Sequence, residues 1–208
     1  MNFARLSPGG SIVKFPVDIR TEYRAISWPA KDDDITDAML PKDIVRVKDG
    51  EKPTDPFVRI TGEKLEKRQG VWWRLYLTAK WTSKEIADYR KAEVAAHRWN
   101  VETGGLTISA LNVTVETSID SQNRISSIIT HARLAGITSV NFKALSGWVT
   151  LTIEQVEAIA RAVALHVQAC FSAENAHSVE IDKLLLKPNA FENLVKYDVK
   201  ANWPNAVI

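Results

Sequence analysis

The stretch LTIEQVEAIARAVALHVQACF, residues Leu151–Phe171, decides how the second half of the chain folds. Thr152 and Gln155 have the spacing of a capping box, in which each side chain accepts a hydrogen bond from a backbone N–H of the other residue. Leu151 and Val156 flank this box at the positions of a hydrophobic staple. These signals predict a helix that begins at about residue 153 and continues at least to residue 173.

Two residues of this stretch carry reactive side chains. Cys170 is the chain's only cysteine, and His166 is one of its four histidines. A helical wheel with about 100° per residue places Cys170 within the apolar side of the helix and His166 at its margin. The other members of the apolar side are Val156, Ile159, Ala160, Val163, Val167 and Phe171. Because a buried cysteine usually behaves as a small hydrophobic residue, core packing is the favoured interpretation.

Two chemical alternatives remain for this pair. A cysteine-dependent hydrolase needs a third group to orient His166 and donors for an oxyanion, and a position in the C-terminal half of a helix opposes formation of a thiolate. A zinc site needs three or four ligands, whereas this pair provides two. The other histidines show no ligand spacing between them: His97, His131 and His177. We therefore predict no catalytic, cofactor-binding or metal-binding residue.

Two stretches of the first half also have side chains that could bind a ligand. The sequence from Trp72 to Leu77 predicts a strand with Trp72 and Trp73 on opposite faces. Such aromatic faces can bind a sugar or a base, but the core of a small domain is the favoured interpretation. The acidic run Asp32–Asp34 lacks the further ligands and the glycine of a calcium loop, so we interpret it as a solvated loop.

The order of the predicted elements indicates an α+β fold with four parts. Residues 1–82 form a small N-terminal antiparallel β domain, residues 83–99 a connector helix, residues 100–186 a hairpin-helix-hairpin-helix α+β domain, and residues 187–208 a C-terminal tail. The connector helix has a thin apolar stripe of Ile86, Tyr89 and Ala96, which suits a connector or a helix that packs on another copy of itself. The tail has no clean period, so we expect it to be ordered only against a partner.

Turn residues and periodicity place the shorter elements. The predicted strands are residues 3–6, 11–15, 44–47, 72–77, 106–108, 113–115, 140–144 and 148–151. A helix is predicted over residues 121–135, with Asp120 or Ser118 as its N-cap and Gly136 as its C-terminal glycine.

Composition excludes several classes of protein. With 45% hydrophobic and 25% charged residues, the chain has the composition of an ordinary globular protein. The net charge of +2 is too small for the basic footprint of a nucleic-acid-binding protein. A single cysteine provides no internal disulfide, and no apolar run reaches the roughly 20 residues of a membrane span. We therefore expect a soluble protein that is made in the cytoplasm, without a nucleic-acid partner and without a membrane span.

Several motifs carry a resemblance to a known family. In the second half they are HRW at residues 97–99, ETGG at 102–105, SIDSQ at 118–122, VNFKA at 140–144, GWVTLT at 147–152 and HVQACF at 166–171. Residues 97–183 resemble a domain family of unknown function that recurs in small phage and prophage proteins encoded beside tail-fibre genes. The first half is similar to the N-terminal region of such proteins through VKFPV at 13–17, DAMLP at 37–41 and IVRV at 44–47.

The resemblance implies a protein of the phage tail, without catalytic residues that could be carried over. We expect a non-enzymatic structural protein of the virion, located in the baseplate and tail-fibre region, with tail-fibre or baseplate proteins as partners. A homo-oligomer is expected because virion parts obey closed symmetry. The alternative is a tail-fibre assembly chaperone that is made in the host cytoplasm and absent from the mature virion. A cysteine-dependent hydrolase is the third and least favoured function.

Overall fold

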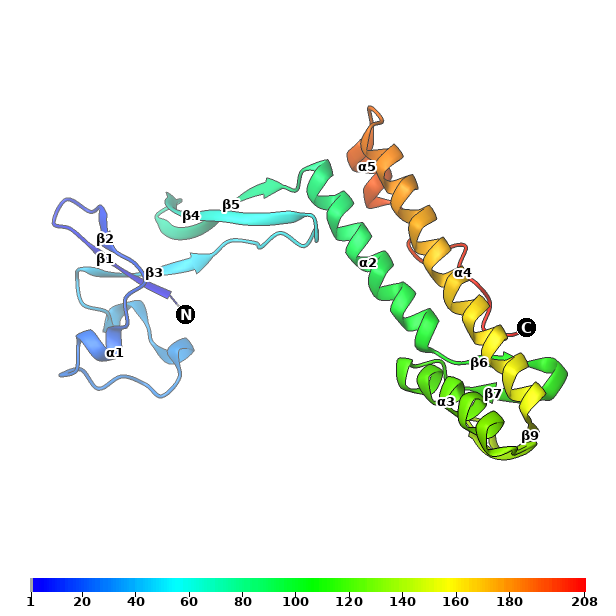
Figure 1. The fold of residues 1–208 in the computed structure, drawn as a ribbon. Helices are drawn as coiled ribbons and strands as arrows, with labels where there is room; N and C mark the ends of the chain where they lie inside the picture. The colour runs from blue at the N-terminus through cyan, green and yellow to red at the C-terminus, as the bar shows by residue number, and fades with distance from the viewer. Residues whose placement is uncertain (1) are drawn as a thin grey trace. The chain divides into compact units, whose positions relative to one another are not determined.

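The computed structural model describes residues 2–208 and divides the chain into two compact units, one ending at Trp81 and the other beginning at Thr82. The predicted α+β class is confirmed. The first unit contains an antiparallel-rich sheet, and the second contains helices and small hairpins (Figure 1).

The first unit is built on a five-stranded sheet with the order β2-β1-β3-β5-β4. Its strands are β1 (Asn2–Leu6), β2 (Ile12–Lys14), β3 (Ile44–Asp49), β4 (Val58–Arg68) and β5 (Val71–Lys80). Neighbouring strands are antiparallel except β3 and β5, which run parallel. The opening hairpin and the strands predicted around residues 44–47 and 72–77 are confirmed, whereas the sequence did not predict β4.

The strand β4 escaped prediction because its apolar residues alternate poorly with charged ones, and because the pairing register shifts between Ile60 and Gly62. The signal that identifies it is the dipeptide Gln69-Gly70. Both residues have positive φ, at 50° and 83°, which matches the two-residue turns that suit the twist of a hairpin. Arg68 pairs with Val71 directly across this turn, so the dipeptide sets the register of the β4–β5 hairpin.

The core of the first unit lies beside β1 and β3, where the short helix α1 (Ile19–Glu22) and the following loop cover the sheet. Its buried residues are Phe3, Val17, Ile19, Ile35 and Ile44. The expectation that Trp72 and Trp73 form this core is wrong, because both side chains are half-buried outside this cluster. β3 pairs with β5 only over Trp72–Arg74, and the rest of the hairpin extends past it.

The second unit has the predicted order of hairpin, helix, hairpin and helix after its first helix. Its elements are α2 (Ser83–Thr103), β6 (Leu106–Ile108), β7 (Val113–Val115), α3 (Ile119–Ala135), β8 (Ser139–Ala144), β9 (Gly147–Thr152), α4 (Ile153–Leu185) and α5 (Ala190–Val195). The two hairpins are separate two-stranded sheets rather than parts of one sheet.

The predicted helix ends are confirmed by hydrogen bonds. Both capping boxes form, at Thr82 for α2 and at Thr152 for α4. Ser118 caps α3 by accepting from the backbone N–H of Ser121, and Gly136 ends that helix with a φ of 65°. These caps fix where each helix leaves its hairpin.

An apolar cluster joins the N-terminal part of α4 to both hairpins and to α3. Its buried members are Leu106, Ile108, Val113, Val115, Ile125, Ala144, Leu151, Val156, Ile159 and Val163. The periodicity of LTIEQVEAIARAV predicted the α4 members of this cluster, and the β-branched residues of β6 and β7 supply much of the rest.

The helix α2 belongs to the second unit and packs along α4, whereas we expected residues 83–99 to be a connector (Figure 1). Contacts of Lys91 with Asp182 and of Arg98 with Glu174 show that the two helices run antiparallel. The buried residues of α2 include Ile86 and Val94, but Tyr89 and Ala96 are exposed. The buried face of α2 differs from the predicted stripe because the side chains of Arg90 and Arg98 are also largely buried. A prediction from apolar periodicity assigns charged residues to the exposed face.

The last 22 residues, predicted as a tail ordered only by a partner, are ordered against their own unit. Leu194 of α5 is fully buried, and its carbonyl oxygen accepts from Arg90 Nε at 3.0 Å. The N–H of Thr107 donates to the carbonyl oxygen of Ala206 at 2.8 Å, so the last residues run beside β6. Among residues 2–208, no helix combines the length and the apolar character that crossing a membrane requires.

Candidate functional site

The His166 and Cys170 side chains meet between α2 and α4. Cys170 is fully buried, and His166, which the wheel placed at the margin, is only 5% exposed. The Cys170 Sγ lies 3.7 Å from His166 Nε2, and the same nitrogen lies 3.2 Å from the carbonyl oxygen of Val101. A carbonyl oxygen can only accept, so the contact with Val101 requires Nε2 to carry the proton. A protonated Nε2 cannot remove the thiol proton of Cys170.

The surroundings of Cys170 hold its thiol in the neutral form. The pKa of the thiol is raised to about 11, chiefly by burial and also by the carboxylate of Glu102, while the guanidinium of Arg98 acts in the opposite direction. Because α4 continues to Leu185, Cys170 lies in the middle of the helix rather than near its C-terminus. Burial, rather than the helix dipole we expected, therefore opposes thiolate formation.

A charged cluster lies beside this pair. Arg98 forms ion pairs with Glu102 on its own helix and with Glu174 on α4, the latter with 2.8 Å between Nε and Oε2. The guanidinium also lies 4.5 Å from the centre of the Phe171 ring. The Glu102 carboxylate is buried, so Arg98 supplies the counter-charge that makes its burial tolerable. The cluster holds α2 against α4 and presents no activated nucleophile.

The C-terminal segment brings two further histidines together. Trp203 stacks on His177 at 5.2 Å between ring centres and meets His97 edge-to-face at 5.1 Å. His177 also contacts the Tyr197 hydroxyl at 2.6 Å and the Ala201 carbonyl oxygen at 2.9 Å. These contacts use both ring nitrogens of His177, so its role is to hold the segment in place. Among residues 2–208, no group of three or more His, Cys, Asp and Glu side chains is placed to hold a metal ion.

The candidates in the first unit do not converge on a site. Asp32 pairs with Arg20 at 2.9 Å, and Asp33 and Asp34 are exposed in the same 3₁₀ turn. The Trp73 ring lies 5.7 Å from the Lys48 ammonium. These are isolated surface contacts.

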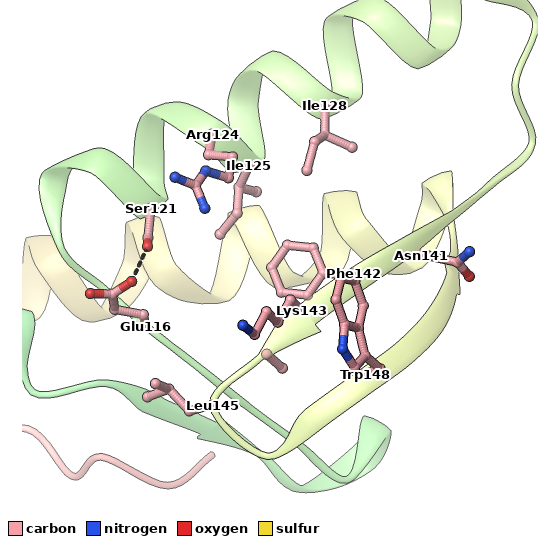
Figure 2. A pocket seen from close by; sticks show the side chains of 11 residues that line it. Glu116, Ser121, Arg124, Ile125, Ile128, Asn141, Phe142, Lys143, Leu145 and Trp148 are labelled. Carbon is pink, nitrogen blue, oxygen red and sulfur yellow. Dashed lines mark hydrogen bonds between the residues drawn. The ribbon is translucent and has the colours of Figure 1, made fainter.

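A cleft that the sequence did not indicate lies between α3 and β8 in the second unit. Its volume is about 400 Å³, within the range of about 300–1,000 Å³ that is common for ligand sites. Figure 2 shows Arg124 and Ile125 of α3 on one side of the cleft, and Phe142 and Lys143 of β8 on the other. The residues that line the cleft come from separate elements of the chain, so no local sequence motif predicts the cleft. The one sequence signal is Trp148, next to a turn glycine.

Comparison with known proteins gives one match. A family model described as a domain of unknown function (DUF4376) matches residues 85–199, which is more than half of the chain. No curated protein and no solved structure matches the chain. The matched range begins in the first turn of α2 and continues through α5, so it includes the charged cluster, the histidines and the cleft.

Proposed function

The chain belongs to the DUF4376 family of domains of unknown function, and we propose that it is a non-enzymatic structural protein of a phage tail. In this proposal it lies in the baseplate and tail-fibre region and acts by binding other proteins. The phage setting rests on the resemblance of residues 97–183 to proteins encoded beside tail-fibre genes. The family description itself names no function.

One contrast in the second unit supports a binding role. The residues with reactive chemistry, His166 and Cys170, are buried and satisfied, whereas large apolar residues are exposed at the turn of the β8–β9 hairpin. Trp148 is 71% exposed and Leu145 is 62% exposed. Exposed tryptophan is typical of protein contact surfaces, where it contributes a large area at little cost in side-chain entropy. The exposed hairpin turn is therefore the observation that carries the proposal.

Mass spectrometry of purified phage particles tests the proposal. We expect peptides of this chain in the tail fraction, and particles carrying Trp148→Ala should retain less of the chain than particles carrying Leu134→Ala. Leu134 is a suitable control because it is 81% exposed on α3. If purified particles had complete fibres but contained no peptide of this chain, the structural role would be ruled out.

The same particle preparations test the alternative that the chain is a tail-fibre assembly chaperone. In that case the chain would be absent from particles but would co-purify with fibre proteins before assembly, and fibres would fail to attach when it is deleted. Cys170→Ser should leave fibre attachment unchanged, because the thiol is buried and protonated. Loss of attachment in this variant, with the fold intact, would favour an enzyme.

A further inference from the structure

The cleft between α3 and β8 exists because two elements share one support. Both α3 and β9 pack on α4, and β8 is held mainly through its pairing with β9. Figure 2 shows α3 and the hairpin on either side of the open space, with α4 behind them. The cleft is thus set mainly by helices and strands, and two of its lining residues, Glu116 and Leu145, lie in the adjoining loops.

The cleft runs along the edge of β8. Residues Asn141–Leu145 all line it, although neighbouring side chains of a strand point to opposite faces. A cleft that touches every residue in turn must follow the strand edge. Among residues 2–208, β8 pairs with β9 alone, so this edge has no partner strand. Just beyond it, the Leu145 N–H donates to the Thr114 carbonyl oxygen at 2.8 Å, which marks the end of the open edge.

The charges around the cleft favour an acidic ligand. Arg124 on α3 and Lys143 on β8 line it, and neither has an ion-pair partner in the part of the chain that the structure describes. Lys143 lies 5.9 Å from the centre of the Trp148 ring. The one carboxylate of the cleft, Glu116, accepts a hydrogen bond from the Ser121 hydroxyl at 2.6 Å (Figure 2). Two cations therefore face the space against one carboxylate that already has a donor.

Apolar side chains form the rest of the lining. Ile125 is buried, and Ile128 and Phe142 are half-buried, so together they offer an apolar wall. The exposed Trp148 ring lies on the other face of the hairpin, beside Lys143, and adds a second apolar surface to the lining of the cleft. A polyanion without apolar groups would leave this wall uncovered, whereas a peptide can provide carboxylates and apolar side chains together.

We propose that this cleft binds an extended acidic peptide segment of a partner protein. The segment adds a strand to the open edge of β8, so its backbone supplies the missing hydrogen bonds. Its carboxylates lie against Arg124 and Lys143, and an aliphatic or aromatic side chain covers Phe142 on one face of the hairpin or Trp148 on the other. This inference rests on the proposed function, because it specifies how the chain contacts another tail protein.

A peptide array probed with the full chain tests the inference. One set of short peptides combines Asp or Glu with one aliphatic or aromatic residue, and the matched set replaces each acid by Asn or Gln. We expect binding to the acidic set, weakening with added salt because the charges are exposed. The best peptide should lose binding when alternate backbone nitrogens are methylated, because a strand pairing needs those N–H groups.

Variants assign the binding to the cleft. The double variant R124Q/K143Q should weaken binding about five- to tenfold, since each exposed ionic contact contributes a modest factor. Arg161→Gln is the matched control, because Arg161 is an exposed cation on α4 that does not line the cleft. Trp148→Ala should also weaken binding, and Leu134→Ala should not. All these side chains are exposed, so thermal melting should stay unchanged.

The inference would be overturned if the Asn and Gln peptides bound as tightly as the acidic peptides, or if R124Q/K143Q bound the acidic peptides as tightly as the unchanged chain does. It would also be overturned if a nucleic acid or a polysaccharide, and no other acidic peptide, displaced the bound peptide. Its failure is separable from that of the proposed function. A chain found in phage tails that binds no acidic peptide keeps the structural role and loses this cleft ligand. A chain that binds the peptides but is absent from tails loses the structural role alone.

Discussion

The two halves of α4 are equally buried but are held by different forces. In the N-terminal half, Val156, Ile159 and Val163 pack among apolar residues of the two hairpins. In the C-terminal half, the buried positions include His166, Cys170 and His177, whose neighbours are charged or hydrogen-bonding groups. One continuous helix therefore crosses from an apolar core into one that mixes polar groups with apolar residues such as Ile181.

The difference shows that side chains with reactive chemistry can take part in the packing of two helices. Apolar contacts are non-directional and tolerate small shifts, whereas the polar half needs each partner in place. Arg98 must reach Glu102 and Glu174, and Tyr197 must reach His177. Removing the partner of a buried charge, as in the Arg98–Glu102 pair, should consequently cost more than removing one apolar side chain of similar burial.

The largest expected effect is that of Arg98→Met. The substitution leaves the buried Glu102 carboxylate without its counter-charge, so the free energy of unfolding should fall by about 3–5 kcal/mol. Chemical denaturation measures it, with the exposed Arg161→Met as the control. The double variant R98M/E102L should recover part of the loss. A double variant no more stable than R98M would mean that Glu102 is not the source of the cost.

The next effect is that of Ile159→Ala in the apolar half. Ile159 is fully buried, and removing its side-chain carbons should lower the free energy of unfolding by about 2–4 kcal/mol. Leu165→Ala on the same helix should stay within about 0.5 kcal/mol, since Leu165 is 66% exposed. Similar losses in these two variants would show that the helix does not bury the face we describe.

A smaller effect is expected for Tyr197→Phe, which removes the hydroxyl that contacts His177. The loss should be about 1 kcal/mol, the usual net contribution of one hydrogen bond. Because this contact anchors the C-terminal segment, amide exchange should accelerate at Thr107, whose N–H donates to Ala206. Unchanged exchange at Thr107 would show that the segment is held without His177.

Local sequence patterns predicted well the N-terminal half of α4 and the elements that pack on it. The capping boxes at Thr82 and Thr152 fix two helix starts because their hydrogen bonds span only three residues. Gly136 and the short β-branched runs are equally local signals. The apolar members of α4 follow from one helical period, and they form the cluster that joins the helix to the hairpins.

The polar half and the cleft depend on contacts between distant residues. His166 meets Val101 across 65 positions, and Arg90 meets Leu194 across 104. A wheel drawn for one helix cannot show that His166 faces a second helix, or that Arg90 and Arg98 are buried. The C-terminal segment lacks a period because a few anchors hold it, such as Trp203 between His97 and His177. The α3–β8 cleft likewise arises only when α3 and β9 pack on α4.

Thiol labelling tests most directly whether the reactive pair of α4 serves packing. The Cys170 pKa rises from its ordinary value of 9.0 to about 11 in the folded chain, so the folded state keeps the proton within this window while the unfolded state releases it. The thiol's contribution to stability is therefore complete below this window and is lost as the pH rises through it.

Labelling of the native chain with iodoacetamide at neutral pH, followed by mass spectrometry, gives the decisive result. We predict that Cys170 is modified only as fast as the chain opens, so denaturant should raise the labelling and unfolding rates together. His166→Ala should not slow the labelling. Rapid labelling of the folded chain at neutral pH, lost in His166→Ala, would contradict the account and identify an activated nucleophile.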